Sequence, residues 1–192
     1  FGDDVAILAG DGLYAEAFRH VLTRQQGEPA HVLAAVAELA AATAVEGMVG
    51  GQYLDVAGDR HAGTDAAHAL RRTHELKTGR LIGASVECVL LLAGMSPSTT
   101  TEYRAFAAEL GVLFQIVDDI LDVTGTDAAL GKPRGSDERQ GKRTYVTEFG
   151  LEGARELAIR SHREARDSLA AAAPGGAPEL EQITDFIATR SS

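Results

Sequence analysis

Apolar residues recur about every 3.6 positions along nearly the whole chain, and this spacing limits the possible folds more than any other feature. In the first segment, from Asp3 to Arg24, the residues with this spacing are Ile7, Leu8, Leu13, Phe18, Val21 and Leu22. No segment alternates apolar and polar residues as a strand would. Ala dominates the apolar set and Trp is absent, which favours helix over sheet. The 192 residues therefore predict a single all-α domain, a helical bundle spanning residues 1–192.

Glycine, proline and polar runs divide the chain into the expected helices. These cover 3–24, about 29–45, two helices within 64–94 that meet near Thr78 and Gly79, one carrying 114–122, and two at about 151–172 and 178–190. A Gly-rich bend is expected at 47–51. A loop is expected at 97–101, with Thr100 or Thr101 as the N-cap of the next helix. The polar, Gly-rich and basic stretch 124–145 is expected to be a long surface loop.

Charge and cysteine content exclude several classes of protein. The formal net charge of −10 argues against a nucleic-acid-binding protein, but local cations could still bind a small phosphorylated ligand. Cys88 is the single cysteine, so an internal disulfide is impossible and a reducing compartment is expected. No apolar stretch is expected to reach the roughly 18 residues of a transmembrane segment, and no signal peptide is visible. We therefore expect a cytoplasmic protein without a transmembrane segment.

The stretch FQIVDDILD, at 114–122, places three carboxylates in an apolar helix. Gln115, Asp118, Asp119 and Asp122 are spaced i, i+3, i+4 and i+7, so they share one stripe. Like charges at this spacing destabilise a helix, and burying them unpaired would cost far more. A solvated helix face is one interpretation. The apolar flanks favour the other, a stripe that faces a cavity holding water, a metal or a basic partner. Clustered carboxylates with open positions suit Mg²⁺, which usually also binds substrate phosphates.

Three other segments are each weaker signals. The sequence KTG at 77–79 could place an ammonium and a hydroxyl on one phosphate oxygen, or Lys77 could simply interact with a helix end. The basic loop 131–145 could close over a metal-bound diphosphate, or it could be a solvated loop. In GGQYLDV, at 50–56, Gln52 and Asp55 could line the same cavity, although a capped helix turn is the better explanation of this segment by itself.

Together these segments favour one chemistry. A carboxylate-bound Mg²⁺ with separate lysine donors is what the ionisation of a diphosphate ester requires, because both stabilise the charge that develops on the leaving group. No protein nucleophile is needed, and the sequence shows no convincing Ser/His/Asp or Cys/His set. The six histidines lack metal-ligand spacing.

An ordered set of motifs resembles the trans-isoprenyl diphosphate synthases, or polyprenyl synthetases, and among them the geranylgeranyl diphosphate synthases. The motifs are AILAGDGL (6–13), GMVGGQYLD (47–55), KTGRLI (77–82), FQIVDDILD (114–122), LGKPRGSD (130–137) and GKRTY (141–145). The resemblance implies an isoprenoid-synthase-type helical bundle, usually a homodimer, with a central cavity. It also implies a Mg²⁺-dependent prenyltransferase that ionises an allylic diphosphate to a carbocation and free diphosphate. The double bond of isopentenyl diphosphate then attacks the carbocation, and loss of a proton completes a five-carbon extension.

The resemblance also assigns roles to individual residues. It implies Asp118, Asp119 and Asp122 as Mg²⁺ ligands, and Lys77, Asp118 and Asp119 as catalytic residues. The residues implied in substrate binding are Gln52, Lys77, Thr78, Gln115, Lys132 and Lys142.

One departure from the family leaves alternatives open. The family's first aspartate-rich motif should precede the segment at 6–13, and FGDDV at 1–5 cannot replace it. We therefore expect the C-terminal portion of a synthase. One alternative is a non-catalytic truncated paralogue or partner subunit that binds a complete synthase. Another is a class I terpene cyclase, although the KTG and LGKPRGSD motifs favour an elongating enzyme.

Overall fold

A computed structural model describes residues 2–57, 66–125 and 142–190, and all the regular structure in these ranges is helical. The helices are α1 (Asp3–Arg24), α2 (Pro29–Thr43), α3 (Met48–Ala57), α4 (Ala66–His74), the π-helical turn η1 (Glu75–Gly79), α5 (Arg80–Leu92), α6 (Pro97–Thr124), α9 (Tyr145–Ala172) and α10 (Pro178–Thr189). The predicted all-α class is confirmed.

Several helix ends differ from the prediction. The bend after α2 ends at Gly47, so most of the Gly-rich segment lies inside α3. Helix α6 begins at Pro97 and its N-cap is Ser96, whose hydroxyl accepts from the backbone N–H of Thr99, so the predicted loop and threonine caps are wrong. Proline fits this first position because its missing N–H would have no helical partner there. Helix α9 starts at Tyr145, before the predicted start at about 151. It is kinked at Gly150, whose φ of 71° is not helical.

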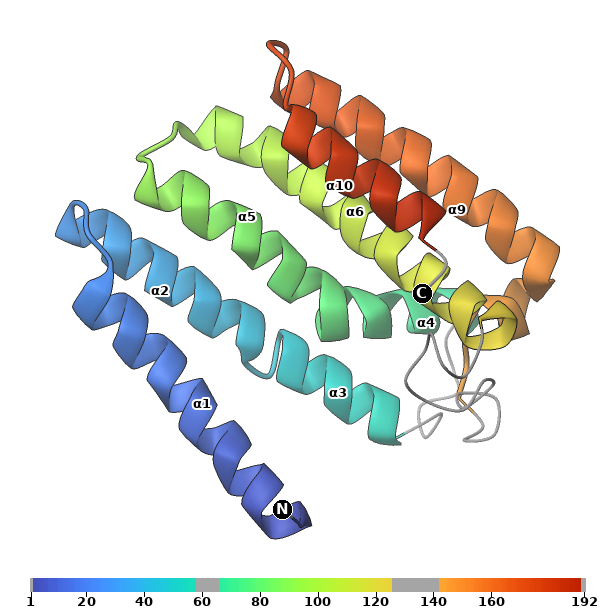
Figure 1. Ribbon diagram of the computed structural model, residues 1–192, viewed down its shortest axis with the longest axis horizontal. Coiled ribbons are helices and arrows are strands. Elements are labelled where there is room, and N and C mark those ends of the chain that lie inside the picture. Colours follow the sequence, from blue (N-terminus) through green and yellow to red (C-terminus); the bar gives the residue numbers. More distant parts are fainter. Residues whose placement is uncertain (1, 58–65, 126–141, 191–192) are drawn as a thin grey trace.

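The helices lie side by side in a curved layer, with α10 packed over α6 and α9 (Figure 1). Helix α6 is central: it contacts α9 on one side and α5 on the other, and α5 in turn packs against α2. The largest core cluster joins α6 to α9 and α10. Its buried residues are Phe106, Leu110, Leu113, Val117, Leu121, Leu169 and Ile187. Each such side chain contributes about 1.5–3 kcal/mol by leaving water, so this cluster fixes the position of α6.

Glycines bring three elements unusually close together. A Cβ on Gly51 of α3 would overlap the backbone of Lys77 in η1 and lie 2.5 Å from its Cα atom. A Cβ on Gly111 of α6 would lie 3.0 Å from the Cα atom of Gly79. Helix α3 therefore approaches the middle of η1, and α6 approaches its last residue, both at backbone distance, which only glycine permits at Gly51.

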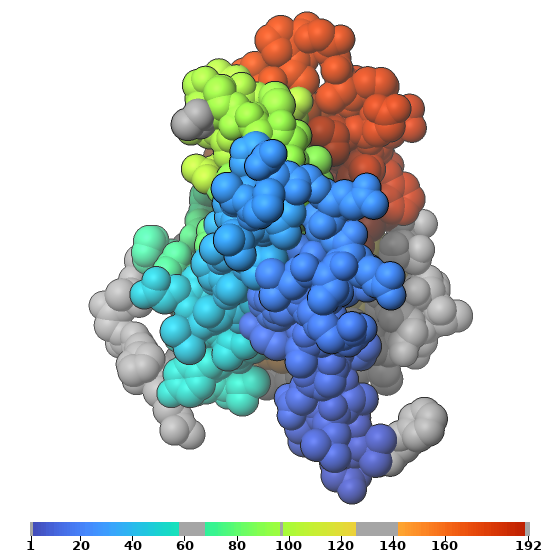
Figure 2. Space-filling model, turned by 90° about the vertical axis from the view of Figure 1, so that its left-hand side faces the viewer, coloured from blue at the N-terminus to red at the C-terminus, as the bar shows by residue number. Residues whose placement is uncertain are grey.

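Helix α1 is an exception, because none of its residues is buried. Ile7, Leu8, Leu13 and Leu22 expose between 52% and 71% of their surfaces, so the apolar residues whose recurrence predicts this helix are not covered by the bundle. Its contact with α2 includes a 2.8 Å hydrogen bond between the hydroxyls of Tyr14 and Thr43. In the space-filling view, α1 lies on the outside and its N-terminal end projects beyond the rest of the bundle (Figure 2).

One segment, Pro29–Ala57, is long and apolar enough to cross a membrane, with a mean hydropathy of 1.7. The expectation that no stretch reaches this length is therefore wrong. Length and composition are the only support for a membrane span, and the core helix of a water-soluble protein can pass the same test.

The close contact at Gly51 leads to a testable prediction. We expect Gly51→Ala to lower the free energy of unfolding by about 3 kcal/mol or more, because the methyl group meets backbone rather than a side chain that can move. Gly111→Ala is the matched control, with an expected cost of about 1 kcal/mol or less, since its contact is less severe and alanine favours helix. Urea denaturation of both variants measures the difference. Equal stability of Gly51→Ala and the wild type would contradict the close approach.

Candidate active site

The π-helical turn η1 carries two of the predicted site residues. It lies between α4 and α5 and contains Lys77 and Thr78. A π-helical turn inserts an extra residue into an otherwise continuous helix and so changes the direction in which side chains point, often at a functional site. Here it directs Lys77 toward α3 and Thr78 toward α6.

Asp55, on α3, holds two lysines together. Its Oδ2 atom lies 2.8 Å from the Nζ of Lys77 and 3.7 Å from the Nζ of Lys142. All three side chains are largely shielded, exposing 18% of Asp55, 27% of Lys77 and 31% of Lys142. Burial alone would raise the pKa of Asp55, but the hydrogen bond from Lys77 and the charges of Lys77, Lys142 and His74 outweigh it and lower that pKa. Asp55 is therefore ionised and neutralises part of the lysine charge.

A relay of hydrogen bonds connects η1 to α6. The hydroxyl of Thr78 donates to Oε1 of Gln115 at 3.3 Å, and Nε2 of Gln115 donates to Oδ1 of Asp119 at 3.0 Å. Asp119 is 3% exposed. The relay therefore fixes the side-chain amide of Gln115 between the KTG turn and a buried carboxylate.

The start of α9 completes the site. The backbone N–H of Tyr145 donates to Oδ2 of Asp119 at 2.7 Å. This N–H belongs to the first turn of α9, where it has no helical acceptor. Thr144 caps the same turn in a reciprocal pair with Thr147. The short segment from Lys142 to Tyr145 therefore contacts Asp55 at one end and Asp119 at the other, and closes a ring of contacts through α3, η1 and α6.

Asp118 and Asp122 differ in their surroundings. Asp122 is 2% exposed, whereas 47% of the Asp118 side chain is exposed. Within the part of the chain described, no group of three or more histidine, cysteine, aspartate or glutamate side chains is arranged to hold a metal. Asp118 is therefore the most accessible carboxylate of the motif, whereas Asp119 is already engaged by Gln115 and Tyr145. One accessible carboxylate suits Mg²⁺, which commonly takes its other ligands from water and substrate phosphates.

The structure brings together most, but not all, of the predicted residues. Lys77, Thr78, Gln115, Asp119 and Lys142 belong to the ring. The side chain of Gln52 is exposed, one helical turn before Asp55, and is not part of it. Lys132 lies outside the described residues.

Two contributors had no clear signal in the sequence. Almost any residue type could supply the backbone N–H of Tyr145, so the sequence does not mark this donor. The start of a helix after Thr144 is the one signal that could have indicated it. Arg190, whose Nη2 atom lies 3.5 Å from Oδ1 of Asp118, comes from the far end of the chain. The sequence indicates that Asp55 could line a cavity, but it does not indicate that Asp55 pairs with two lysines.

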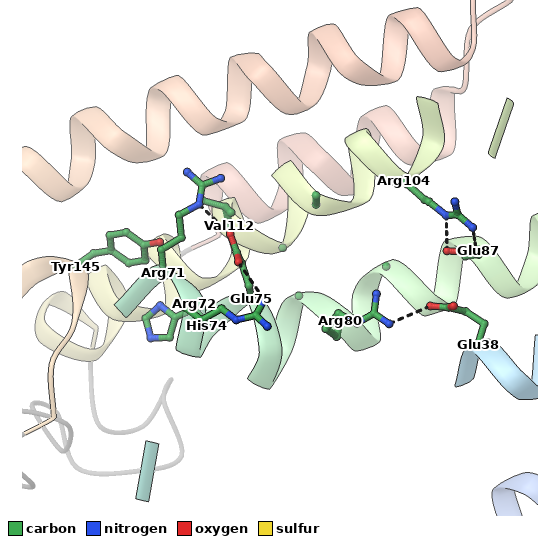
Figure 3. Close-up of a pocket in the computed structure, with 14 residues that line it drawn as sticks. Glu38, Arg71, Arg72, His74, Glu75, Arg80, Glu87, Arg104, Val112 and Tyr145 are labelled. Carbon is green, nitrogen blue, oxygen red and sulfur yellow. Dashed lines mark hydrogen bonds and ion pairs between the residues drawn. The ribbon is translucent and has the colours of Figure 1, made fainter. Parts of the chain in front are cut away.

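A separate pocket of about 480 Å³ lies on another face of α5 (Figure 3). Gly79, Gly83 and Glu87 line it at one-turn intervals, whereas Lys77, Thr78 and Asp118 do not. Its charged residues are paired with one another, with Arg80 3.6 Å from Glu38 and Arg104 hydrogen-bonded to Glu87. These pairs tie α5 to its neighbours α2 and α6.

Tyr145 borders the same pocket, and burial raises the pKa of its phenol to about 12. The phenol stays neutral at physiological pH. The group of Tyr145 that contacts the charge of Asp119 is its backbone N–H.

The lowered pKa of Asp55 gives a pH-dependent prediction. The pKa of Asp55 is lower in the folded than in the unfolded protein. Its ionised form therefore contributes fully to the free energy of unfolding at pH values above the ordinary aspartate pKa of about 3.9. The contribution is then lost as the pH falls through the lower folded value. We expect Asp55→Asn to be less stable than the wild type by up to about 1 kcal/mol at pH 7, and the two to converge in acid. Glu152→Gln, at an exposed ion pair, is the control and should show little difference at any pH. Urea denaturation across pH tests this, and a difference that persists at pH 2 would contradict it.

Comparison with known proteins identifies one family. The polyprenyl synthetase family model matches residues 1–173. The chain is 38% identical to geranylgeranyl pyrophosphate synthase 9, chloroplastic, of Arabidopsis thaliana, over 99% of this chain and 54% of that protein. It is 39% identical to geranylgeranyl pyrophosphate synthase, chloroplastic, of Catharanthus roseus, over 100% of this chain and 54% of that protein. The chain thus spans about half the length of these curated relatives.

Solved structures show the same fold. A geranyltransferase from Helicobacter pylori, solved with magnesium and isoprenyl diphosphate, matches with a TM-score of 0.83 and 28% identity, over 97% of this chain and 60% of that one. A geranyltransferase from Legionella pneumophila matches with a TM-score of 0.80 and 30% identity, over 100% of this chain and 62% of that one. Together with the family match, these structures show that the chain belongs to the polyprenyl synthetase family and has its all-helical fold.

Proposed function

We propose that the protein carrying this chain is a Mg²⁺-dependent prenyltransferase that condenses an allylic diphosphate with isopentenyl diphosphate. The main support is the ring of contacts in which Lys77, Lys142, Gln115 and Asp119 meet around Asp55 and η1. Two cations and an accessible carboxylate, Asp118, thus lie on elements fixed to one another, as the binding of a metal diphosphate requires.

In this proposal the two lysines bind the diphosphate of the allylic substrate. They are held near each other by Asp55, so little conformational freedom is lost when their ammonium groups turn to the substrate. Their charges stabilise the diphosphate as it leaves with the electrons of the carbon–oxygen bond. Thr78 and Gln115 supply neutral hydrogen-bonding groups to the same place. Asp118 would hold Mg²⁺, which when bound neutralises charge on the diphosphate oxygens. Asp119 orients Gln115 and the first turn of α9.

We further propose geranylgeranyl diphosphate as the product. The support is the identity of 38–39% to relatives named as geranylgeranyl pyrophosphate synthases. Another relative of similar identity is named as a geranylfarnesyl diphosphate synthase, so the product must be identified directly.

The experiment uses the purified full-length protein, Mg²⁺, labelled isopentenyl diphosphate and allylic diphosphates of increasing length. We expect label in an elongated product whose chain length mass spectrometry gives. Asp118→Ala should lower turnover by about 100-fold or more, in the range seen when one transition-state charge contact is removed. Glu152→Ala, at a side chain 80% exposed on α9, is the control and should leave turnover unchanged. Turnover of Asp118→Ala within a few-fold of the wild type would refute the metal assignment.

The second candidate is a non-catalytic subunit. One relative is named as the large subunit of a heterodimeric geranylgeranyl pyrophosphate synthase, so association of unlike chains occurs in the family. Activity of the purified protein alone would exclude this candidate. Inactivity alone, followed by a changed product distribution when a complete synthase is added, would favour it over the first.

We also propose that α1 forms the contact between two copies in a homodimer. The support is that none of its residues is buried although its apolar residues are helically spaced. The double variant Leu8→Glu, Leu13→Glu should convert a dimer to a monomer, because it would place four charges in the apolar contact. Ile159→Glu, at an equally exposed position on α9, should leave the dimer intact. Light scattering after size-exclusion chromatography measures the mass, and a dimer that survives the double variant would rule out α1 as the contact.

A further inference from the structure

Arg190, at the end of α10, reaches across to the aspartate motif of α6. Its side chain is 13% exposed, and its guanidinium carbon lies 4.3 Å from the centre of the Phe114 ring. Its Nη2 atom donates to the backbone carbonyl of Phe114 at 3.4 Å and lies 3.5 Å from Oδ1 of Asp118. A cation from the end of the chain therefore lies against the carboxylate that is most accessible to a metal.

The guanidinium is not fully satisfied in this position. Its buried Nε atom has no hydrogen-bond partner among the described residues. The ion pair at 3.5 Å is also longer than the usual 2.7–2.9 Å of a charge-assisted hydrogen bond. The pair with Asp118 is therefore weak enough to exchange for another cation.

The body of α10 is anchored independently of Arg190. Arg166 on α9 lies 3.1 Å from Glu181, and His162 lies 2.7 Å from Asp185. Thr184 and Ile187 are buried against the bundle. Arg190 itself has an extended backbone just after the helix, so its side chain can move while the helix stays in place.

We propose that Arg190 is a positioning residue that occupies the Asp118 carboxylate in the metal-free protein and is displaced when a divalent cation binds. This rests on the proposed function, in which Asp118 is a metal ligand. Two cations cannot share one carboxylate without repulsion, so Arg190 lowers the affinity of the site for free metal. The arrangement parallels that of Asp55, which pairs with Lys77 and Lys142. The site thus keeps its anion-binding lysines and its metal-binding carboxylate each paired with a protein group until a metal diphosphate replaces both partners.

The test is a Mn²⁺ titration of the full-length protein without diphosphate, followed by electron paramagnetic resonance of the free ion. We expect Arg190→Gln to lower the Kd for Mn²⁺ by about threefold or more. Arg166→Gln, which also removes an arginine that contacts α10, should leave the Kd unchanged. In an Asp118→Asn background, Arg190→Gln should have no effect, because the shared carboxylate is gone.

The outcomes distinguish an error in the role of Arg190 from an error in the assignment of Asp118 as a metal ligand. If Asp118→Asn weakens Mn²⁺ binding but Arg190→Gln leaves it unchanged or weaker, the role of Arg190 is wrong and the metal assignment stands. If Asp118→Asn leaves Mn²⁺ binding unchanged, the metal assignment fails and the role of Arg190 fails with it.

A second measurement needs no variant. If a divalent cation displaces Arg190, the side-chain Nε–H signal of Arg190 in the NMR spectrum, which the Phe114 ring shifts, should move toward that of a solvated arginine when Mg²⁺ is added to the wild type, while the signal of Arg166 stays the same. An unchanged Arg190 signal would overturn the displacement.

Discussion

The buried carboxylate of Asp119 is the interaction on which the site depends. It is 3% exposed and accepts from the backbone N–H of Tyr145 and the side-chain amide of Gln115. A carboxylate removed from water without such partners would cost several kcal/mol, so the three groups must keep their places together. Since Tyr145 begins α9 and Gln115 bonds to Thr78, this single group sets the start of α9 and the KTG turn relative to α6. Lys142, three residues before Tyr145, is then held within reach of Asp55.

Close backbone contacts provide the second constraint. Gly51 lets α3 approach the middle of η1, and Gly111 lets α6 approach its last residue, Gly79. The π-helical turn directs Lys77 and Thr78 to different neighbours. Long side chains of lysine lose much conformational freedom when they are held in one place. Pairing with Asp55 and close packing already hold Lys77 and Lys142 in place in the folded protein. Their conformational entropy is therefore lost during folding, before any substrate binds. The resulting site is organised, and its charges are balanced internally.

Much of this could be predicted from the sequence, for identifiable reasons. The helices followed from the 3.6-residue spacing, and the combination of KTG with FQIVDDILD indicated diphosphate chemistry, because these signals lie within short segments. The helix caps were harder: Ser96, rather than Thr100 or Thr101, caps α6, since several hydroxyls in a row compete and local sequence does not decide between them. Asp118 and Asp119 are neighbours of the same type, yet one is half exposed and the other buried. Because neighbouring side chains point about 100° apart around a helix, Asp119 faces the start of α9 while Asp118 faces Arg190.

The sequence by itself determined the helical class, the family and the residue types that the site would use, because periodicity and short motifs are properties of adjacent residues. The tertiary structure alone decided which carboxylate is open to a ligand, which two lysines share Asp55, and that Arg190 meets Asp118 and Phe114. These contacts join residues as many as 87 positions apart, as between Asp55 and Lys142. These contacts form because whole helices pack together at the glycine contacts and around the buried carboxylate of Asp119. Such packing depends on residues far apart in the sequence, so no local sequence pattern predicts it.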